Sequence, residues 1–121
     1  MTSEKGPKVE EEPKSFFAET LGDTPPVRIL DFLLENRVSD FTKSEIAEGA
    51  NVSRVTLEKF WPALEGTSIV VETRRIGNGV LFTLNGTSPL VKKILELDDL
   101  LTKMGTERIL SKEKVAMPLN A

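Results

Sequence analysis

The sequence predicts an α+β fold in which two short helices are followed by a β-hairpin and a long final helix. Two helix-capping signals, Thr42 and Ser53, lie eleven positions apart. After them, residues 68–85 read as two strands around a glycine-containing turn, SIVVETRRIGNGVLFTLN. A helix pair of this spacing followed by a hairpin predicts a winged helix-turn-helix with a two- or three-stranded antiparallel sheet.

The N-terminal part divides into a polar tail and a short apolar segment. Residues 1–13 have little to bury and read as a disordered acidic tail. Residues 14–21 favour a short helix that ends at Gly22, with Phe16 and Phe17 on it. Two adjacent phenylalanines need cover. They either dock on the helices of the same chain or join a dimer interface, and the sequence does not decide.

The first full helix begins after Thr24, which can cap it, and Pro25 suits its first position. Its apolar face is broad, so we expect burial from more than one direction. This face contains Val27, Ile29, Leu30, Phe32, Leu33 and Leu34.

In the helix pair, Thr42 and Glu45 have the spacing of a capping box, and Gly49 is expected to end the first helix. Ser53 then caps the second helix. Pro62 opposes helix continuation, so we expect a kink or a new turn there. The apolar face of the second helix is expected to consist of Val55, Leu57, Phe60, Trp61 and Leu64.

The hairpin is expected to turn at Asn78-Gly79, the preferred two-residue type I′ loop. That loop would place Arg75 opposite Phe82 and Arg74 opposite Thr83. The inward face would then consist of Val71, Thr73, Phe82 and Leu84, and Glu72, Arg74 and Thr83 would point outward.

The last helix is expected to begin with Ser88 as its cap and to end at Gly105. One apolar line has the 4, 3, 4, 3 spacing of a coiled-coil seam. We expect it to form a homodimer interface, for which Phe16 and Phe17 are further candidates; the alternative is a monomer whose last helix is core. The seam consists of Leu90, Ile94, Leu97, Leu101 and Met104, and a second line of Val91, Leu95 and Leu100 lies beside it.

Composition excludes several classes of function. The chain has no cysteine and no histidine, which removes disulfides, imidazole bases and the commonest zinc ligands. No paired-carboxylate or phosphate-loop motif is present, so we expect no enzyme, no cofactor and no metal site. No apolar run approaches the length of a membrane span, and we expect a cytoplasmic protein. One domain is predicted at residues 14–104, followed by a flexible tail at 105–121.

Charge argues against an extended basic surface, because the formal net charge is −3. The first 24 residues account for this excess, and residues 25–104 are nearly neutral. A DNA-binding surface must therefore be a local cluster of cations. The candidate DNA-binding residues are Thr42, Lys43, Ser44, Ser53, Arg54, Thr56, Lys59, Arg74, Arg75 and Asn78. For the polar helix face and the arginines, the alternative is ordinary solvated surface.

The run RRIGNGVLFTLN, followed by SPLVKKILELD, resembles the wing and next helix of archaeal winged helix-turn-helix transcriptional regulators in the broad MarR and ArsR superfamily. The resemblance covers about residues 25–103. It implies a DNA-binding domain, commonly homodimeric, with a recognition helix from Ser53 onward and a wing over residues 74–80. The chain departs from that pattern in its lack of basic excess and in Pro62.

We therefore expect a sequence-specific regulator that binds double-stranded DNA, acting as a dimeric repressor or autoregulator. Arg54, Ser53 and Thr56 would meet base edges, and Lys59 would meet phosphate. The alternative is a protein-interaction module, an adaptor that binds a protein partner. The near-neutral charge and the apolar Ile76 and Leu81 close to the hairpin tip favour that alternative.

Overall fold

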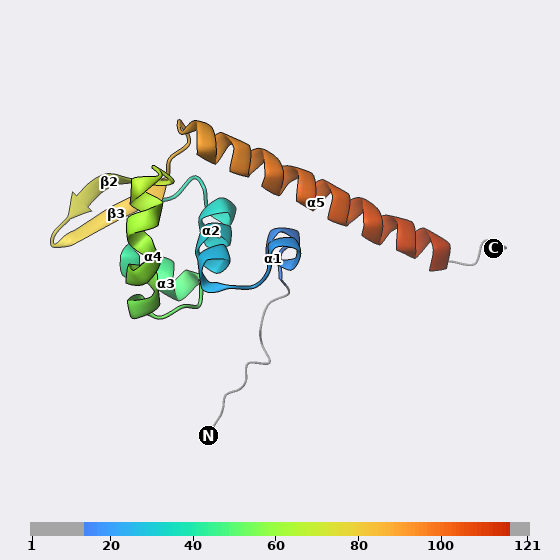
Figure 1. Ribbon diagram of the computed structural model, residues 1–121, viewed down its shortest axis with the longest axis horizontal. Helices are drawn as coiled ribbons and strands as arrows, with labels where there is room; N and C mark the ends of the chain where they lie inside the picture. Colours follow the sequence, from blue (N-terminus) through green and yellow to red (C-terminus); the bar gives the residue numbers. More distant parts are fainter. Residues whose placement is uncertain (1–13, 117–121) are drawn as a thin grey trace, which may run out of the picture.

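The computed structural model describes residues 14–116 and has the predicted α+β architecture (Figure 1). The sequence tails at 1–13 and 117–121 lie outside the described residues. The elements are α1 (Phe16–Leu21), α2 (Pro25–Glu35), β1 (Phe41–Thr42), α3 (Lys43–Gly49), α4 (Arg54–Gly66), β2 (Val70–Ile76), β3 (Gly79–Leu84) and α5 (Pro89–Ala116). Helix α5 projects beyond the rest of the described chain (Figure 1).

The first two helices begin and end close to where the sequence predicts. Ser15 caps α1 by accepting a hydrogen bond from the Ala18 amide, and Gly22 ends it with φ of 103°. Helix α2 begins at Pro25, but the side chain of Thr24 makes no capping hydrogen bond. Glycine suits the left-handed backbone after α1, because other residues are strained there.

The core lies where α2 meets α3, α4 and the sheet. Its buried side chains come from every helix and from two strands. The expectation that Val55 lies on the buried face of α4 is wrong, because its side chain is 78% exposed. The helical period explains the error, since Val55 lies on the side of α4 opposite Leu57 and Trp61. The core residues of at least moderate size are Phe17, Ile29, Leu33, Leu34, Ile46, Leu57, Trp61, Val70, Phe82, Leu84 and Val91.

The helix pair has the predicted caps. Thr42 and Glu45 form the capping box of α3, and the Ser53 hydroxyl accepts from the Thr56 amide at 3.0 Å. Helix α3 ends at Gly49, as predicted, but not because of a left-handed glycine. The left-handed backbone in the turn belongs to Asn51, with φ of 59°. A Cβ atom at Gly49 would overlap the ring of Phe32, so close packing explains this glycine.

Pro62 does not start a new turn, because α4 is one α-helix from Arg54 to Gly66. Leu57 and Trp61 are buried before the proline, and Leu64 packs against the core after it. Burial of side chains before and after Pro62 stabilises the continuous helix, although proline removes one backbone hydrogen-bond donor.

The three strands form an antiparallel sheet in the order β1-β3-β2. The predicted hairpin register is wrong. The loop residues are Gly77 and Asn78, and Ile76 pairs with Gly79. Gly77 takes φ of 60° at the first loop position, as a type II′ turn requires. Glycine at that position therefore moves the turn one residue earlier than the expected Asn78-Gly79 loop.

A β-bulge between Glu72 and Arg74 changes the predicted faces of β2 as well. Thr73 is the extra residue, and it is exposed rather than inward. Val70 is buried instead of Val71. The predicted burial of Phe82 and Leu84 is confirmed. Because a bulge places two residues opposite one, it breaks the alternation on which the prediction depended.

Helix α5 begins at Pro89 as predicted, and the Ser88 hydroxyl accepts from the Val91 amide at 3.3 Å. Its predicted end at Gly105 is wrong, because the helix continues to Ala116. A Cβ atom at Gly105 would overlap the ring of Phe16. This glycine therefore allows α1 to approach α5 and does not mark a helix end.

Candidate nucleic-acid interface

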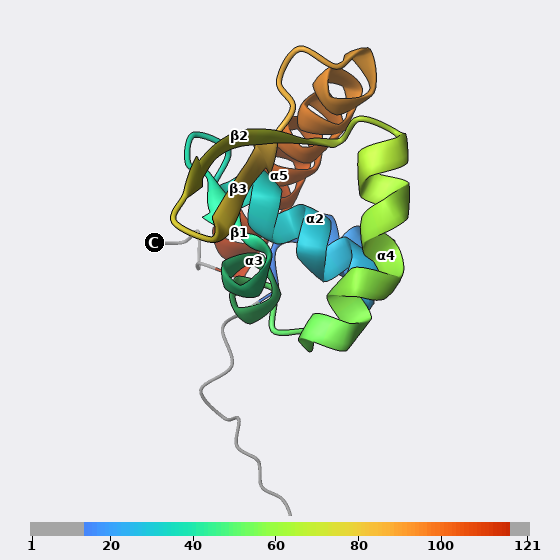
Figure 2. The same cartoon turned by 90° about the vertical axis from the view of Figure 1, so that its left-hand side faces the viewer.

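Helices α3 and α4 and the β2–β3 hairpin lie at one end of the molecule, away from the C-terminal half of α5 (Figure 1). Seen from that end, α3 lies between the hairpin and α4 (Figure 2). Most of the predicted DNA-binding residues belong to these three elements. The fold therefore brings together three elements that lie between residues 43 and 84 of the sequence.

Polar contacts join the first turns of α3 and α4. Arg54 donates to the Ser44 hydroxyl at 2.8 Å and forms an ion pair with Glu58 at 2.9 Å. Lys43 reaches the same carboxylate at 3.2 Å. Hydrogen bonds from Lys43 and Arg54 lower the pKa of Glu58. The three charged side chains form one cluster with a single net positive charge, which we call the Glu58 cluster.

Trp61 connects this cluster to the hairpin. The ammonium of Lys43 lies 5.1 Å from the centroid of the Trp61 ring. Trp61 also meets Phe82 of β3 edge-to-face, with the two centroids 4.9 Å apart. Both aromatic rings are buried, so they fix the hairpin against α4.

The other predicted residues differ in the hydrogen bonds and ion pairs that they already make within the chain. The Ser53 hydroxyl accepts from the Thr56 amide and donates to the Thr56 hydroxyl at 2.9 Å. Ser53 therefore serves first as a helix cap. Lys59 is exposed and makes no ion pair with another described residue. Thr42, likewise, uses its hydroxyl in the cap of α3.

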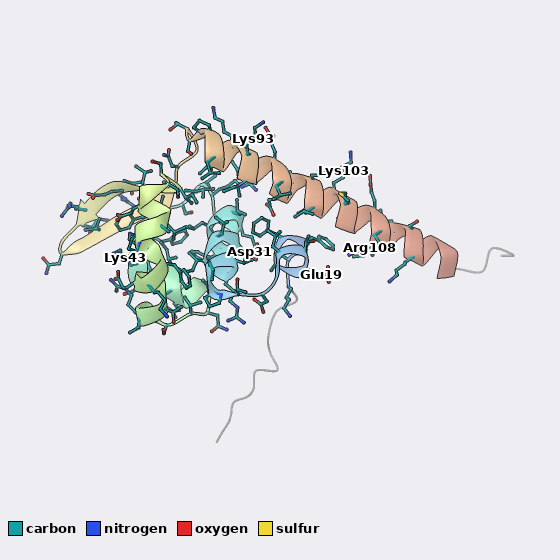
Figure 3. All side chains as sticks on the ribbon, viewed as in Figure 1. Glu19, Asp31, Lys43, Lys93, Lys103 and Arg108 are labelled. Carbon is teal, nitrogen blue, oxygen red and sulfur yellow. The ribbon has the colours of Figure 1, made fainter. Side chains whose placement is uncertain are left out.

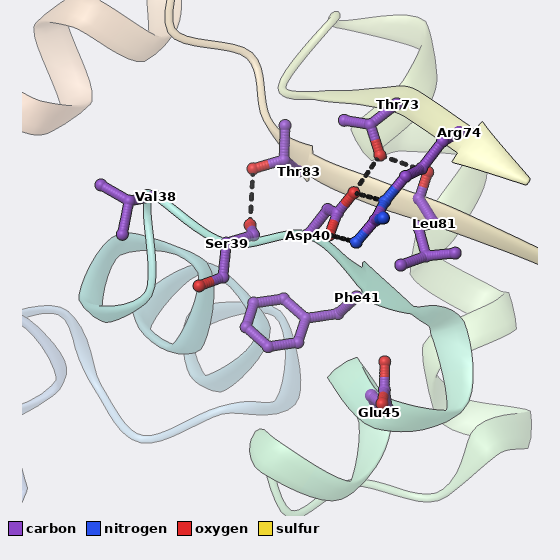
Figure 4. A pocket seen from close by; sticks show the side chains of 9 residues that line it. All are labelled: Val38, Ser39, Asp40, Phe41, Glu45, Thr73, Arg74, Leu81 and Thr83. Carbon is purple, nitrogen blue, oxygen red and sulfur yellow. Dashed lines mark hydrogen bonds and ion pairs between the residues drawn. The ribbon is translucent and has the colours of Figure 1, made fainter. Parts of the chain in front are cut away.

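Arg74 points from β2 toward Asp40, in the loop before β1, across an open pocket (Figure 4). Its guanidinium donates two hydrogen bonds to the carboxylate, at 2.9 and 3.1 Å. The Thr73 hydroxyl donates a third at 2.6 Å. Hydrogen bonds from Arg74 and Thr73 lower the pKa of Asp40 to about 2. The guanidinium of Arg74 is therefore held against the loop before β1 and does not extend past the hairpin tip.

The tip itself carries less charge than the sequence suggests. Arg75 forms an ion pair with Glu72 at 3.0 Å on the same strand. Asn78 is exposed in the turn, and the neighbouring Ile76 is 57% exposed. The tip thus combines one paired arginine, one amide and one apolar side chain.

Comparison with solved structures gives matches to bacterial transcription regulators. AdcR, the adhesin competence repressor of Streptococcus pyogenes, matches with a TM-score of 0.53 and 15% identity over 77% of this chain and 68% of AdcR. ZitR of Lactococcus lactis, a zinc-responsive MarR family member, matches with a TM-score of 0.52 and 18% identity over 70% of this chain and 60% of ZitR. A structure of ZitR in complex with DNA matches with a TM-score of 0.51 and 18% identity, over 88% of this chain and 67% of that one.

The chain has a winged helix-turn-helix fold. It spans between 60% and 68% of the length of the matched AdcR and ZitR chains. No protein-family model matches the sequence, and a comparison with curated proteins finds no match. In this winged helix-turn-helix, α4 occupies the place of the recognition helix and the β2–β3 hairpin is the wing.

Sequence reasoning missed the carboxylates of this surface. These carboxylates are Glu58, which pairs with Lys43 and Arg54, and Asp40, which pairs with Arg74. The spacing of Arg54 and Glu58, four residues apart on one helix, is a local signal that could have found the first pair. No local signal predicts the second, because Asp40 and Arg74 lie 34 residues apart.

The residues predicted for a dimer interface lie on α1 and α5, outside the helix pair and the wing. Phe17 is 1% exposed in the core of this chain, and Phe16 packs at Gly105 of α5. An ion pair at 3.5 Å between Glu19 and Arg108 joins the same two helices (Figure 3). The α5 seam is divided: Ile94 and Leu101 pack against the core. The other three members, Leu90, Leu97 and Met104, are exposed.

Residues 14–116 include no helix that is both long enough and apolar enough to cross a membrane. Within the same residues, no three acidic side chains are placed to hold a metal ion.

Proposed function

We propose that this protein is a sequence-specific regulator of transcription that binds double-stranded DNA, acting as a repressor or autoregulator. The observation that carries the proposal is that α3, α4 and the wing lie together at one end of the molecule (Figure 2) and carry five cations, namely Lys43, Arg54, Lys59, Arg74 and Arg75. AdcR is itself named a repressor, and the ZitR structure contains DNA. Their likeness in fold supports the proposal.

In the proposed complex, α4 enters the major groove. Arg54 lies in its first turn, and its guanidinium has the planar fork that can bond a guanine edge at two atoms. Lys59, one and a half turns further, would meet phosphate. Ser53 and Thr56 would contact a base edge or the backbone at the start of the helix.

The wing and the start of α3 would contact the neighbouring backbone. Arg74, Arg75 and Asn78 are proposed to lie along the phosphates or the minor groove. The segment from Thr42 to Ser44 would meet a phosphate mainly through Lys43, which is 25% exposed at its side chain. Both arginines of the wing must exchange a carboxylate for a phosphate when DNA binds.

We also propose a homodimer formed through α5. Its exposed seam residues Leu90, Leu97 and Met104 lie beside Leu100, which is exposed as well. Apolar side chains on one flank of a long helix can pack against the same flank of a symmetry mate. A dimer would place two recognition helices on half-sites one helical turn apart, about 34 Å.

Fluorescence anisotropy with labelled duplex DNA, at about 50 and 200 mM salt, tests the proposal. Wild-type affinity should fall steeply with salt. The double variant Arg54→Ala/Arg74→Ala should bind more weakly and with a shallower salt slope, by about one for each lost phosphate contact. If both proteins bind equally weakly at low and high salt, the DNA-binding proposal is wrong.

The second candidate function is a protein-interaction winged helix. It is favoured by the ion pairs that already occupy Arg54, Arg74 and Arg75, and by the exposed Ile76 at the wing tip. An adaptor of this kind would show no salt-dependent affinity for duplex DNA in the same titration.

A further inference from the structure

Val55 lies in the first turn of α4, next to Arg54, and its side chain is 78% exposed. It gains little packing from the fold, because the buried side of the helix carries Leu57 and Trp61. A β-branched residue also has only moderate helix propensity. Neither packing nor propensity therefore explains valine at this position.

The surroundings of Val55 are polar. Arg54 precedes it, Thr56 follows it, and Lys59 lies one turn further on the same exposed side. Its isopropyl group is thus an apolar contact surface within an otherwise hydrogen-bonding helix face. If α4 enters a major groove, as the proposed function requires, this group must meet base edges or the backbone.

Base edges in the major groove offer one methyl group, on C5 of thymine. The other groups there are hydrogen-bond donors and acceptors, which an isopropyl group cannot satisfy. We propose that Val55 contacts a thymine methyl and so determines specificity for one A·T pair beside the base that Arg54 reads. This inference rests on the proposed function and adds a base preference to it.

The experiment begins with duplexes that wild-type protein selects from a random library. Each thymine of a selected duplex is then replaced by uracil, which removes only the methyl group, and Kd is measured by anisotropy. At one thymine in each half-site, wild type should lose about fourfold in affinity, the value expected for one buried methyl. Val55→Ala changes both protomers of the proposed dimer, so it should bind the thymine duplex about sixteenfold more weakly and show no further loss with uracil.

Val38→Ala is the matched control. Val38 is 95% exposed in the loop between α2 and β1, so the same truncation is made outside the recognition helix. This variant should keep the full uracil effect. Both variants should keep the thermal unfolding midpoint of wild type, because each removed group is exposed.

The outcomes separate this inference from the proposed function. Failure to select any duplex would remove both. A selected duplex with no uracil-sensitive thymine would overturn the role of Val55 and leave DNA binding in place. That role is also overturned if Val55→Ala loses as much affinity with uracil as wild type does.

Discussion

At the scale of single residues, the main feature of the candidate interface is that carboxylates accompany its cations. Glu58 binds Lys43 and Arg54, and Asp40 binds Arg74. A phosphate can contact these cations only by displacing a carboxylate that is already in place. The exchange reduces the gain from any DNA backbone, whatever its sequence, so we expect low non-specific affinity.

Glu58→Gln should therefore increase affinity for random-sequence duplex DNA. The change removes one negative charge from the Glu58 cluster and weakens the competition for Lys43 and Arg54. At low salt we expect about a threefold to fivefold lower Kd, as for one charge pair near water. Anisotropy titrations at two salt concentrations measure it, and the gain should shrink at high salt.

Glu96→Gln provides the comparison for Glu58→Gln. Glu96 is exposed on α5, where it pairs with Lys93, so the same charge is removed far from α3 and α4. This variant should bind as wild type does. Equal gains from both substitutions would mean that net charge alone matters, and the competition described for Glu58 would be wrong.

Asp40 makes stability depend on pH in acid. Its pKa in the folded chain is about 2, below the ordinary value of 3.8, because Arg74 and Thr73 donate to the carboxylate. A lowered folded pKa stabilises the fold above pH 3.8, and this stabilisation is lost as pH falls toward 2. Wild type should be more stable than Asp40→Asn at pH 5, and the gap should close between pH 4 and 2.

Urea unfolding at half-unit pH intervals measures that gap. Thr73→Val is a useful second variant, because it removes one donor and leaves the ion pair between Arg74 and Asp40. Its gap from wild type should have the same sign and be smaller. A gap between wild type and Asp40→Asn that stays constant from pH 5 to 2 would contradict the assignment.

At the scale of elements, the sequence predicted what depends on neighbouring residues. The caps at Thr42, Ser53 and Ser88 all form, because each needs only a side chain and a backbone amide up to three positions later. The predicted hairpin register was wrong because neighbouring residues did not decide it. Two overlapping turn signals, Gly77-Asn78 and Asn78-Gly79, compete there, and the bulge at Thr73 accompanies its contact with the distant Asp40.

Gly105 shows how an element boundary can depend on another element. Gly105→Ala should destabilise the fold, because its methyl group would overlap the ring of Phe16 and push α1 away from α5. Overpacking typically costs about 1–3 kcal/mol, and the higher helix propensity of alanine offsets about 1 kcal/mol. We expect a net loss of about 1 kcal/mol in the free energy of unfolding, measured by urea titration.

Gly66→Ala tests the same change where nothing obstructs it. Gly66 ends α4, and a Cβ atom there would have no heavy atom within 4 Å. Its φ lies outside the left-handed region, so alanine should be neutral or stabilise by up to about 1 kcal/mol. If Gly105→Ala is as stable as Gly66→Ala, the contact between Phe16 and α5 does not hold the two helices together.

At the scale of the whole molecule, the order of helices and strands followed from periodicity and capping, but the distribution of charge and of apolar surface did not. Helical spacing alone could not divide the α5 seam into Ile94 and Leu101, which meet the core, and Leu97, which stays exposed. That division depends on the direction in which α5 crosses the core formed by the other helices and the sheet. The pairing of Arg74 with Asp40 depends likewise on the sheet.

The proposed dimer can be tested through this division of α5. Wild type should have a mass in solution of about twice the 13.4 kDa of one chain, measured by light scattering after size exclusion. Leu97→Glu should shift it to one chain, because a carboxylate would be buried against its symmetry mate. Since Leu97 is 40% exposed in the single chain, monomer folding should survive. Leu110→Glu, at a site 57% exposed on another side of α5, should remain dimeric. A dimer that withstands Leu97→Glu but dissociates with Leu110→Glu would place the interface on the other side of α5.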